Sequence, residues 1–109
     1  MKGAFLGEFE LYVMLALAHL GPEAYGVIIR QEIARRAGRD VAIGAVYATL
    51  ARLEAKGLVT HALSDPQPVQ GGRARKHFRL TRAGERALAH SASMLTRMMH
   101  GWRPRTQSS

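Results

Sequence analysis

The sequence contains no cysteine, and this absence removes several kinds of chemistry at once. Disulfide bonds, catalytic thiolates and zinc sites with cysteine ligands are all excluded. The longest apolar run, residues 11–18, falls well short of the ~20 residues that a membrane-spanning helix needs. The N-terminus also lacks the pattern of a secretory signal, because Glu8 and Glu10 follow it closely. These absences predict a protein of the cytoplasm.

Recognisable catalytic patterns are missing as well. No serine stands in a nucleophile turn, and the histidines show no metal-ligand spacing. We therefore expect no enzyme, no cofactor and no metal. One arrangement stays open, in which His61 and His77 face each other across a hairpin as a metal or proton sensor. The alternative is that both are solvent-exposed strand residues.

Acidic residues are scarce, with 8 Asp and Glu against 16 Lys and Arg, so the formal net charge is +8. The excess lies in the second half, where Glu85 is the only acid after Pro66. Such a balance indicates an anionic partner, either nucleic acid or an acidic membrane surface. Charge alone does not choose between them.

The apolar periodicity predicts a mainly helical chain of 109 residues with one modest core. Glycine or proline follows each of the first three helices as a stop signal. A loop rich in proline, glycine and glutamine separates two short strands. The expected helices are 8–20, 25–37, 43–56 and 82–102, the strands are 58–63 and 75–80, and 40–42 forms a turn or a single crossing strand.

The first and last helices each carry an apolar face that one small core does not use. Leu11 and Leu15 form a second face on the first helix. Apolar positions on the last helix recur at steps of four and three, which is the spacing of a coiled-coil seam. We therefore expect a homodimer in which 82–102 is a dimerisation helix and 103–109 a disordered tail. The expected interface residues are Leu11, Leu15, Leu88, Ala92, Leu95, Met99 and Trp102.

This order of elements is that of a winged helix-turn-helix with a two-stranded β wing, spanning 1–81. In that fold the third helix enters the major groove of DNA. The residues on its outer face would then contact the groove, with the backbone close to the bases. A competing interpretation is that the small residues only permit close helix packing and that Arg52 is a solvated charge. The expected groove residues are Gly44, Ala45, Ala48, Thr49 and Arg52.

The hairpin would contact phosphates. Arg73, Arg75 and Lys76 follow two glycines, which combines flexible backbone with three cations. An ordinary solubilising turn is the alternative. Tyr47 is expected to pack its ring on the base of the hairpin with its hydroxyl reaching a phosphate, or to serve packing alone.

Residues 25–33, 44–59 and 72–84 together resemble the PadR transcriptional regulators, and the resemblance spans most of the chain. The sequence departs from the usual pattern at Ala48, where proline is common, at Ala51, often aromatic, and at Phe78, often tyrosine. These changes bear on the contacts to bases and phosphates rather than on the fold. The pattern is kept at Gly44, Tyr47, Leu50, Arg52, Leu53, Glu54, Gly57, Leu58, Leu80, Thr81 and Gly84.

The resemblance implies a repressor that binds double-stranded DNA as a homodimer at a pseudo-palindromic operator. The short members of the family dimerise through their first and last helices, and some bind flat aromatic compounds at the interface. By that resemblance Met94, Met98, Met99 and Trp102 would line a ligand pocket, whereas plain dimer packing is the other interpretation. A winged-helix RNA-binding module and a protein-interaction adaptor remain the alternative functions.

Overall fold

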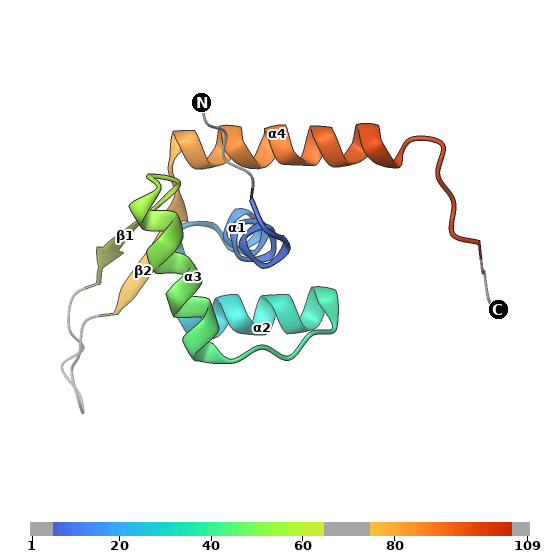
Figure 1. Ribbon diagram of the computed structural model, residues 1–109. Helices are drawn as coiled ribbons and strands as arrows, with labels where there is room; N and C mark the ends of the chain where they lie inside the picture. Colours follow the sequence, from blue (N-terminus) through green and yellow to red (C-terminus); the bar gives the residue numbers. More distant parts are fainter. Residues whose placement is uncertain (1–5, 65–74, 106–109) are drawn as a thin grey trace.

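The structure, a computed structural model, describes residues 6–64 and 75–105. Figure 1 shows α1 near the centre of the molecule, with α4 on one side of it, α2 on the other, and α3 with the hairpin at one end. The mainly helical fold with a two-stranded antiparallel sheet is the one expected. The elements are α1 (Glu8–Leu20), the short helix η1 (Gly21–Glu23), α2 (Gly26–Ala37), α3 (Ile43–Ala55), β1 (Val59–Leu63), β2 (Lys76–Leu80) and α4 (Arg82–Met99).

The core forms where α1, α2 and α3 meet. Apolar residues on these helices lose nearly all of their exposure, and removal of this surface from water is the main favourable contribution to folding. Phe78 is the residue of β2 that packs into this core. The buried apolar residues are Val13, Met14, Ala16, Leu17, Ala24, Ile29, Ile33, Val46, Leu50, Leu53, Leu58, Val59 and Phe78.

The hairpin pairs β1 with β2 from Val59 opposite Leu80 to Leu63 opposite Lys76. No strand occurs at 40–42 in this described segment, so the option of a crossing strand there is wrong. Those residues connect α2 to α3. Ala24 forms an isolated antiparallel bridge with Phe78 on the other edge of β2, where the Ala24 carbonyl accepts a 2.7 Å hydrogen bond from the Phe78 N–H.

Thr81 joins the end of α3 to the start of α4. Its Oγ1 accepts a hydrogen bond from the Gly84 N–H at 2.9 Å and donates one to the Gly57 carbonyl at 2.7 Å. The Thr81 N–H donates to the Leu58 carbonyl at 3.0 Å. Thr81 is therefore the N-cap of α4, and it also fixes α4 on the turn that follows α3.

Helix α4 ends at Met99 rather than at residue 102. His100 is extended and Gly101 has a φ of 83°, a left-handed value that favours glycine and turns the chain out of the helix. Trp102 therefore lies beyond the helical seam. Figure 1 shows the second half of α4 running past α1 and away from the hairpin. No helix in the described part of the chain is long and apolar enough to cross a membrane.

Candidate nucleic-acid interface

Helix α3 has one buried side and one exposed side. Val46, Leu50 and Leu53 are buried, as the spacing predicts. The exposed side is formed mainly by small residues, and the hairpin lies beside it at the same end of the molecule (Figure 1). Four of the five expected groove residues are on this exposed side, namely Gly44, Ala45, Ala48 and Arg52.

The placement of Thr49 on the exposed face is wrong. Its exposed fraction is 1%, because position 49 falls between Val46 and Leu53 on the side that packs inward. The Thr49 hydroxyl accepts a 3.1 Å hydrogen bond from Arg52 Nη2. Thr49 therefore supports Arg52 from within the fold.

Arg52 is held from the side of α1. Its Nε lies 3.8 Å from Oε2 of Glu10, a largely buried carboxylate that also accepts a 3.0 Å hydrogen bond from Lys56 Nζ. Burial by itself raises the pKa of Glu10. The hydrogen bonds from the Gly7 N–H and Lys56, together with the charges of Lys56 and Arg52, outweigh that effect, so the pKa of Glu10 is lowered overall. This cluster fixes the flank of α3 to α1.

Tyr47 packs on the start of α2. A Cβ added at Gly26 would lie 2.3 Å from Cζ and Oη of Tyr47, so the ring needs a glycine beneath it. The ring of Tyr47 therefore has a packing partner on α2 that the sequence did not predict. The residue keeps an exposed fraction of 44%, so part of it remains on the outer surface of α3.

At the hairpin, Arg75 and Lys76 are exposed, whereas Arg73 lies outside the described residues. The Arg75 N–H donates to Ser64 Oγ at 3.1 Å, and its Cζ lies 4.4 Å from the ring centroid of Tyr25. The apolar spacing over residues 25–37 predicts only that Tyr25 faces inward. No local pattern links it to an arginine so far along the chain.

The two hairpin histidines do not face each other. His61 is opposite Phe78 and His77 is opposite Ala62, so their side chains point to opposite faces of the sheet. His61 Nδ1 lies 2.6 Å from Glu54 Oε2 on α3. Among the residues that the structure describes, no group of three side chains could hold a metal ion.

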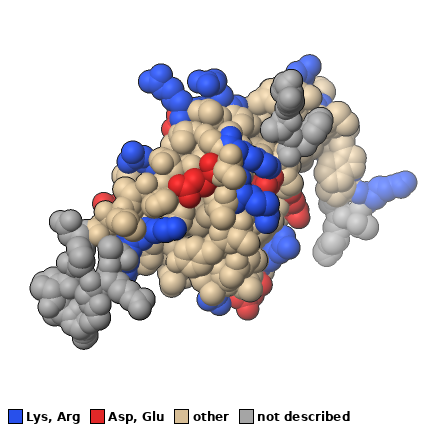
Figure 2. All heavy atoms as spheres, turned by 60° about the vertical axis from the view of Figure 1, so that its left-hand side comes forward, with Lys and Arg blue, Asp and Glu red and all other residues tan. Residues whose placement is uncertain are grey.

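Positive charge lies in separate groups on one face of the molecule (Figure 2). On the face shown in Figure 2, Lys and Arg side chains alternate with wide uncharged areas and a few acidic side chains. Net charge alone therefore does not mark one site. The position of the cations relative to α3 and the hairpin is more informative.

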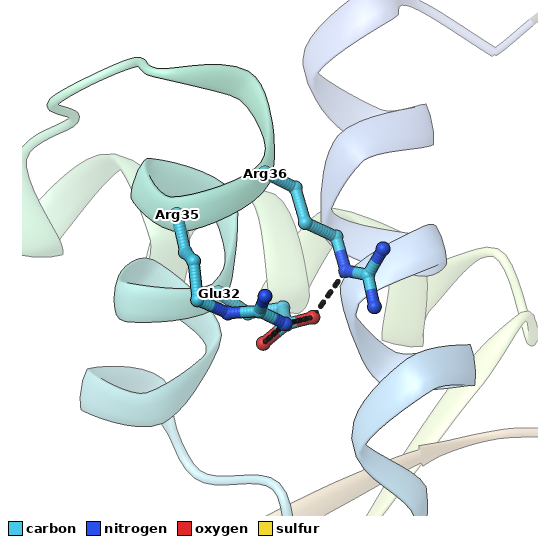
Figure 3. Close-up of polar contacts among 3 residues, drawn as sticks. All are labelled: Glu32, Arg35 and Arg36. Carbon is cyan, nitrogen blue, oxygen red and sulfur yellow. Dashed lines mark hydrogen bonds and ion pairs between the residues drawn. The ribbon is translucent and has the colours of Figure 1, made fainter.

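Two arginines of α2 are engaged within the helix. Arg35 Nη2 donates to both carboxylate oxygens of Glu32, at 3.0 and 2.9 Å, and Arg36 also donates to Glu32 (Figure 3). The hydrogen bonds from Arg36 and Arg35 lower the pKa of Glu32, although burial opposes them. One of these two positive charges is therefore compensated inside the chain.

The expected interface residues separate into two groups. Leu88 is half-buried and packs against the chain's own core, and Leu11 is also half-buried. Ala92 is exposed. The remaining large apolar residues are at least two-fifths exposed: Leu15 (42%), Leu95 (50%), Met99 (53%) and Trp102 (62%).

The four expected ligand residues lie on the surface of the single chain. Met94 and Met98 are 41% and 78% exposed on α4, like Met99 and Trp102 further along. A cavity of about 180 Å³ lies elsewhere, between α1 and α2. Its lining includes Tyr12, Leu15, Ala16, His19, Glu32, Ile33, Arg36 and Ala37.

Helix α3, the hairpin and the projecting α4 define a winged-helix protein. The transcriptional regulator PadR-like family matches residues 14–90. This match covers most of the chain, which therefore belongs to the PadR-like family of transcriptional regulators. Members of this family are regulators and not enzymes.

Individual relatives agree with this assignment. The transcriptional regulator Rv3488 of Mycobacterium tuberculosis is 42% identical over 73 residues, which cover 67% of this chain and 64% of that protein. The PadR-like transcription factor from Bacteroides fragilis superposes with a TM-score of 0.72 at 28% identity, over 84% of each chain. The PadR family transcriptional regulator from Eggerthella lenta gives a TM-score of 0.66 at 28% identity, over 85% of this chain and 82% of that one.

Proposed function

We propose that this protein is a sequence-specific DNA-binding repressor that acts as a homodimer on a pseudo-palindromic operator. The observation that carries the proposal is the exposed side of α3, where Gly44, Ala45 and Ala48 leave the backbone uncovered beside the basic hairpin. A helix with such a face can enter the major groove closely. Genomic DNA would be its partner, which is also why we expect the protein in the cytoplasm.

The cations would have different tasks. Arg75 and Lys76, with Arg73 further along the hairpin, would contact phosphates, which fixes the position on the duplex without reading sequence. Arg52 and Tyr47 lie on opposite flanks of the exposed side of α3. They would reach base edges or the adjacent backbone, whereas buried Thr49 would act only by supporting Arg52.

The homodimer proposal rests on α4. Of its residues only Gly84 is buried, so the apolar residues along its second half have no cover within the described part of the chain. Exposed apolar surface of this kind favours association, and Leu15 on α1 is a further exposed apolar residue. A two-fold symmetric dimer would present two copies of α3, and its operator would then repeat in inverted orientation.

A small effector would act through the same surface. Met94, Met98, Met99 and Trp102 combine flexible apolar side chains with one flat aromatic ring. In a dimer, two such sets would be brought together. A flat aromatic compound held between them would release the operator by changing the spacing of the two α3 helices.

The test compares binding of a genomic fragment containing the protein's own gene with binding of a random duplex, by footprinting and fluorescence anisotropy. Ala48→Glu places a carboxylate in the middle of the exposed side of α3, facing the acceptors and phosphates of DNA. Ser93→Glu adds the same charge on an exposed position of α4 and is the matched control. We expect Ala48→Glu to lower the affinity for both duplexes about tenfold or more, whereas Ser93→Glu should keep the wild-type affinity. Equal losses in the two variants would contradict the proposed interface.

A further inference from the structure

Tyr25 lies at the junction of α2 and the hairpin. Its ring is against the side chains of His77, which is in β2, and of Arg75, which directly precedes that strand. The Cζ of Arg75 is 4.4 Å from the ring centroid. The ring also stacks on His77, with centroids 5.8 Å apart and planes inclined by 27°. Arg75 and His77 are two residues apart, so their side chains leave the same face of the strand. Tyr25 therefore covers that face where the hairpin leaves the core.

The backbone on both sides of Tyr25 is fixed. Ala24 is fully buried, and its carbonyl accepts the hydrogen bond from the N–H of Phe78, itself a core residue. The Tyr25 carbonyl accepts a 3.0 Å hydrogen bond from the Ile29 N–H, which begins α2. The ring is thus attached to the rigid body of the domain rather than to the hairpin.

Arg75 depends on this ring for its position. Its side chain is exposed, and none of the ion pairs found within residues 6–64 and 75–105 includes it. An exposed arginine loses conformational entropy when it binds a phosphate. An arginine already resting on an aromatic face has lost part of that freedom. Stacking uses the face of the guanidinium, so its N–H donors remain available.

We propose that Tyr25 is a positioning residue for DNA binding, which holds the Arg75 guanidinium where it can contact the phosphate backbone. The inference rests on the proposed function, because it assigns Arg75 a phosphate contact. It adds a residue from α2 to a contact otherwise made by the hairpin alone.

The DNA experiment is a double-mutant cycle on a random duplex, read by anisotropy over a series of salt concentrations. Arg75→Ala lowers the salt slope by about 0.9 for each subunit, or about 1.8 for the proposed homodimer, because one phosphate contact is lost in each subunit. Tyr25→Leu weakens binding about two- to fivefold for each subunit, as expected from the strength of an exposed cation–π contact, and Tyr25→Phe keeps wild-type affinity. In the Arg75→Ala background Tyr25→Leu has no further effect. Equal weakening by Tyr25→Leu in both backgrounds would overturn the proposal, since the ring would then act without Arg75.

The matched control is Arg39→Ala. Arg39 is another surface arginine over aromatic rings, with its Cζ 5.8 Å from the ring centroid of Phe9 and 5.7 Å from that of Tyr12. This variant removes the same charge away from the hairpin, so its effect on affinity is smaller than that of Arg75→Ala. An equal loss in the two arginine variants would show that total charge, not the Tyr25 contact, determines binding.

A measurement without DNA separates this inference from the proposed function. In the free protein, NMR should show upfield ring-current shifts of the Arg75 side-chain protons that disappear in Tyr25→Leu and persist in Tyr25→Phe. Unshifted Arg75 protons in the wild-type protein would overturn the positioning role, whatever the protein binds. Shifted protons in a protein that binds no duplex would instead contradict the proposed function and the contact assigned to Arg75.

Discussion

Gly84, in the first turn of α4, lies directly against the backbone carbonyl of Leu58, and a Cβ added to Gly84 would come within 2.0 Å of that oxygen. The same carbonyl accepts the hydrogen bond from the Thr81 N–H. The start of α4 is therefore seated on the turn after α3 through contacts that only a glycine at position 84 allows.

Replacing this glycine should destabilise the protein. Gly84→Ala gains helix propensity, but the methyl group meets backbone that cannot move without shifting α3 or α4. We expect a net loss of about 1 to 3 kcal/mol in the free energy of unfolding, measured by chemical denaturation. Gly44→Ala is the control, because that helical glycine has nothing within 4 Å of the added Cβ. Gly44→Ala should raise the free energy of unfolding by about 0.5 to 1 kcal/mol. A loss of stability in this variant as large as in Gly84→Ala would contradict the prediction.

Acidification should reveal the contribution of Glu10. Its pKa in the folded protein is lowered from the ordinary value of 4.5, so the carboxylate stabilises the fold above that pH and loses its effect as the pH falls through the folded pKa. Glu10→Gln should lower the free energy of unfolding at neutral pH by about 1 to 3 kcal/mol. It should also reduce the dependence of stability on pH below about 4.5, measured by denaturation at a series of pH values.

Glu8→Gln is the control for this prediction. The Glu8 side chain is 70% exposed, and its Oε1 lies 3.6 Å from Arg39 Nη1. Exposed pairs of this kind contribute little, so we expect a change within about 0.5 kcal/mol. If Glu8→Gln and Glu10→Gln shifted stability equally, the buried cluster at Glu10 would have no special role.

The proposed homodimer predicts a single sedimenting species of twice the chain mass at micromolar concentration. Leu95→Asp places a carboxylate in the apolar surface of α4, where an unpaired buried charge costs several kcal/mol, and should dissociate or unfold the dimer. Ser93→Asp puts the same charge on an exposed position away from the seam and should leave the dimer intact. A wild-type monomer would exclude this mode of assembly.

Arg52→Ala should affect specificity more than total affinity. If Arg52 contacts a base edge, its loss costs roughly 1 to 3 kcal/mol on the operator and less on random DNA. Thr49→Ala should act in the same direction but more weakly, because Thr49 only accepts a hydrogen bond from Arg52. Fluorescence anisotropy on both duplexes gives the ratio of the affinity for the operator to the affinity for random DNA. An unchanged ratio would assign sequence readout to DNA shape or to the hairpin.

Trp102 provides a direct probe for an effector, because it is the only tryptophan in the chain. A flat aromatic compound that binds beside it should quench its fluorescence and weaken operator binding in parallel. Met98→Ala should reduce both effects if the methionine lines the site. Quenching without any change in DNA affinity would mean that binding at this surface does not regulate the protein.

The helices could be predicted well because their apolar residues recur with the helical period and glycine marks several of their ends. The first helix was expected at 8–20 and is found there. The spacing is less informative at the flanks of a helix. Thr49 was assigned to the outer face of α3, although its side chain is buried. A polar residue at the edge of an apolar stripe carries no local sign of which side it takes.

Contacts between distant segments could not be predicted from spacing. The bridge from Ala24 to Phe78, the ring of Tyr47 on Gly26 and the stacking of Tyr25 on His77 each join residues far apart in the sequence. A single bridge or stack leaves no periodic pattern. The end of α4 was placed too late for another reason. The seam spacing extends to Trp102, and the effect of Gly101 shows only in its backbone angle.

The uncovered α4 also determines how the protein would respond to its own abundance. If two copies must associate before their apolar helices are covered, the active species forms in a second-order equilibrium. Below the dissociation constant of the dimer, halving the number of chains would reduce operator occupancy about fourfold. A repressor built in this way would release its genes sharply when synthesis slows, with no ligand required.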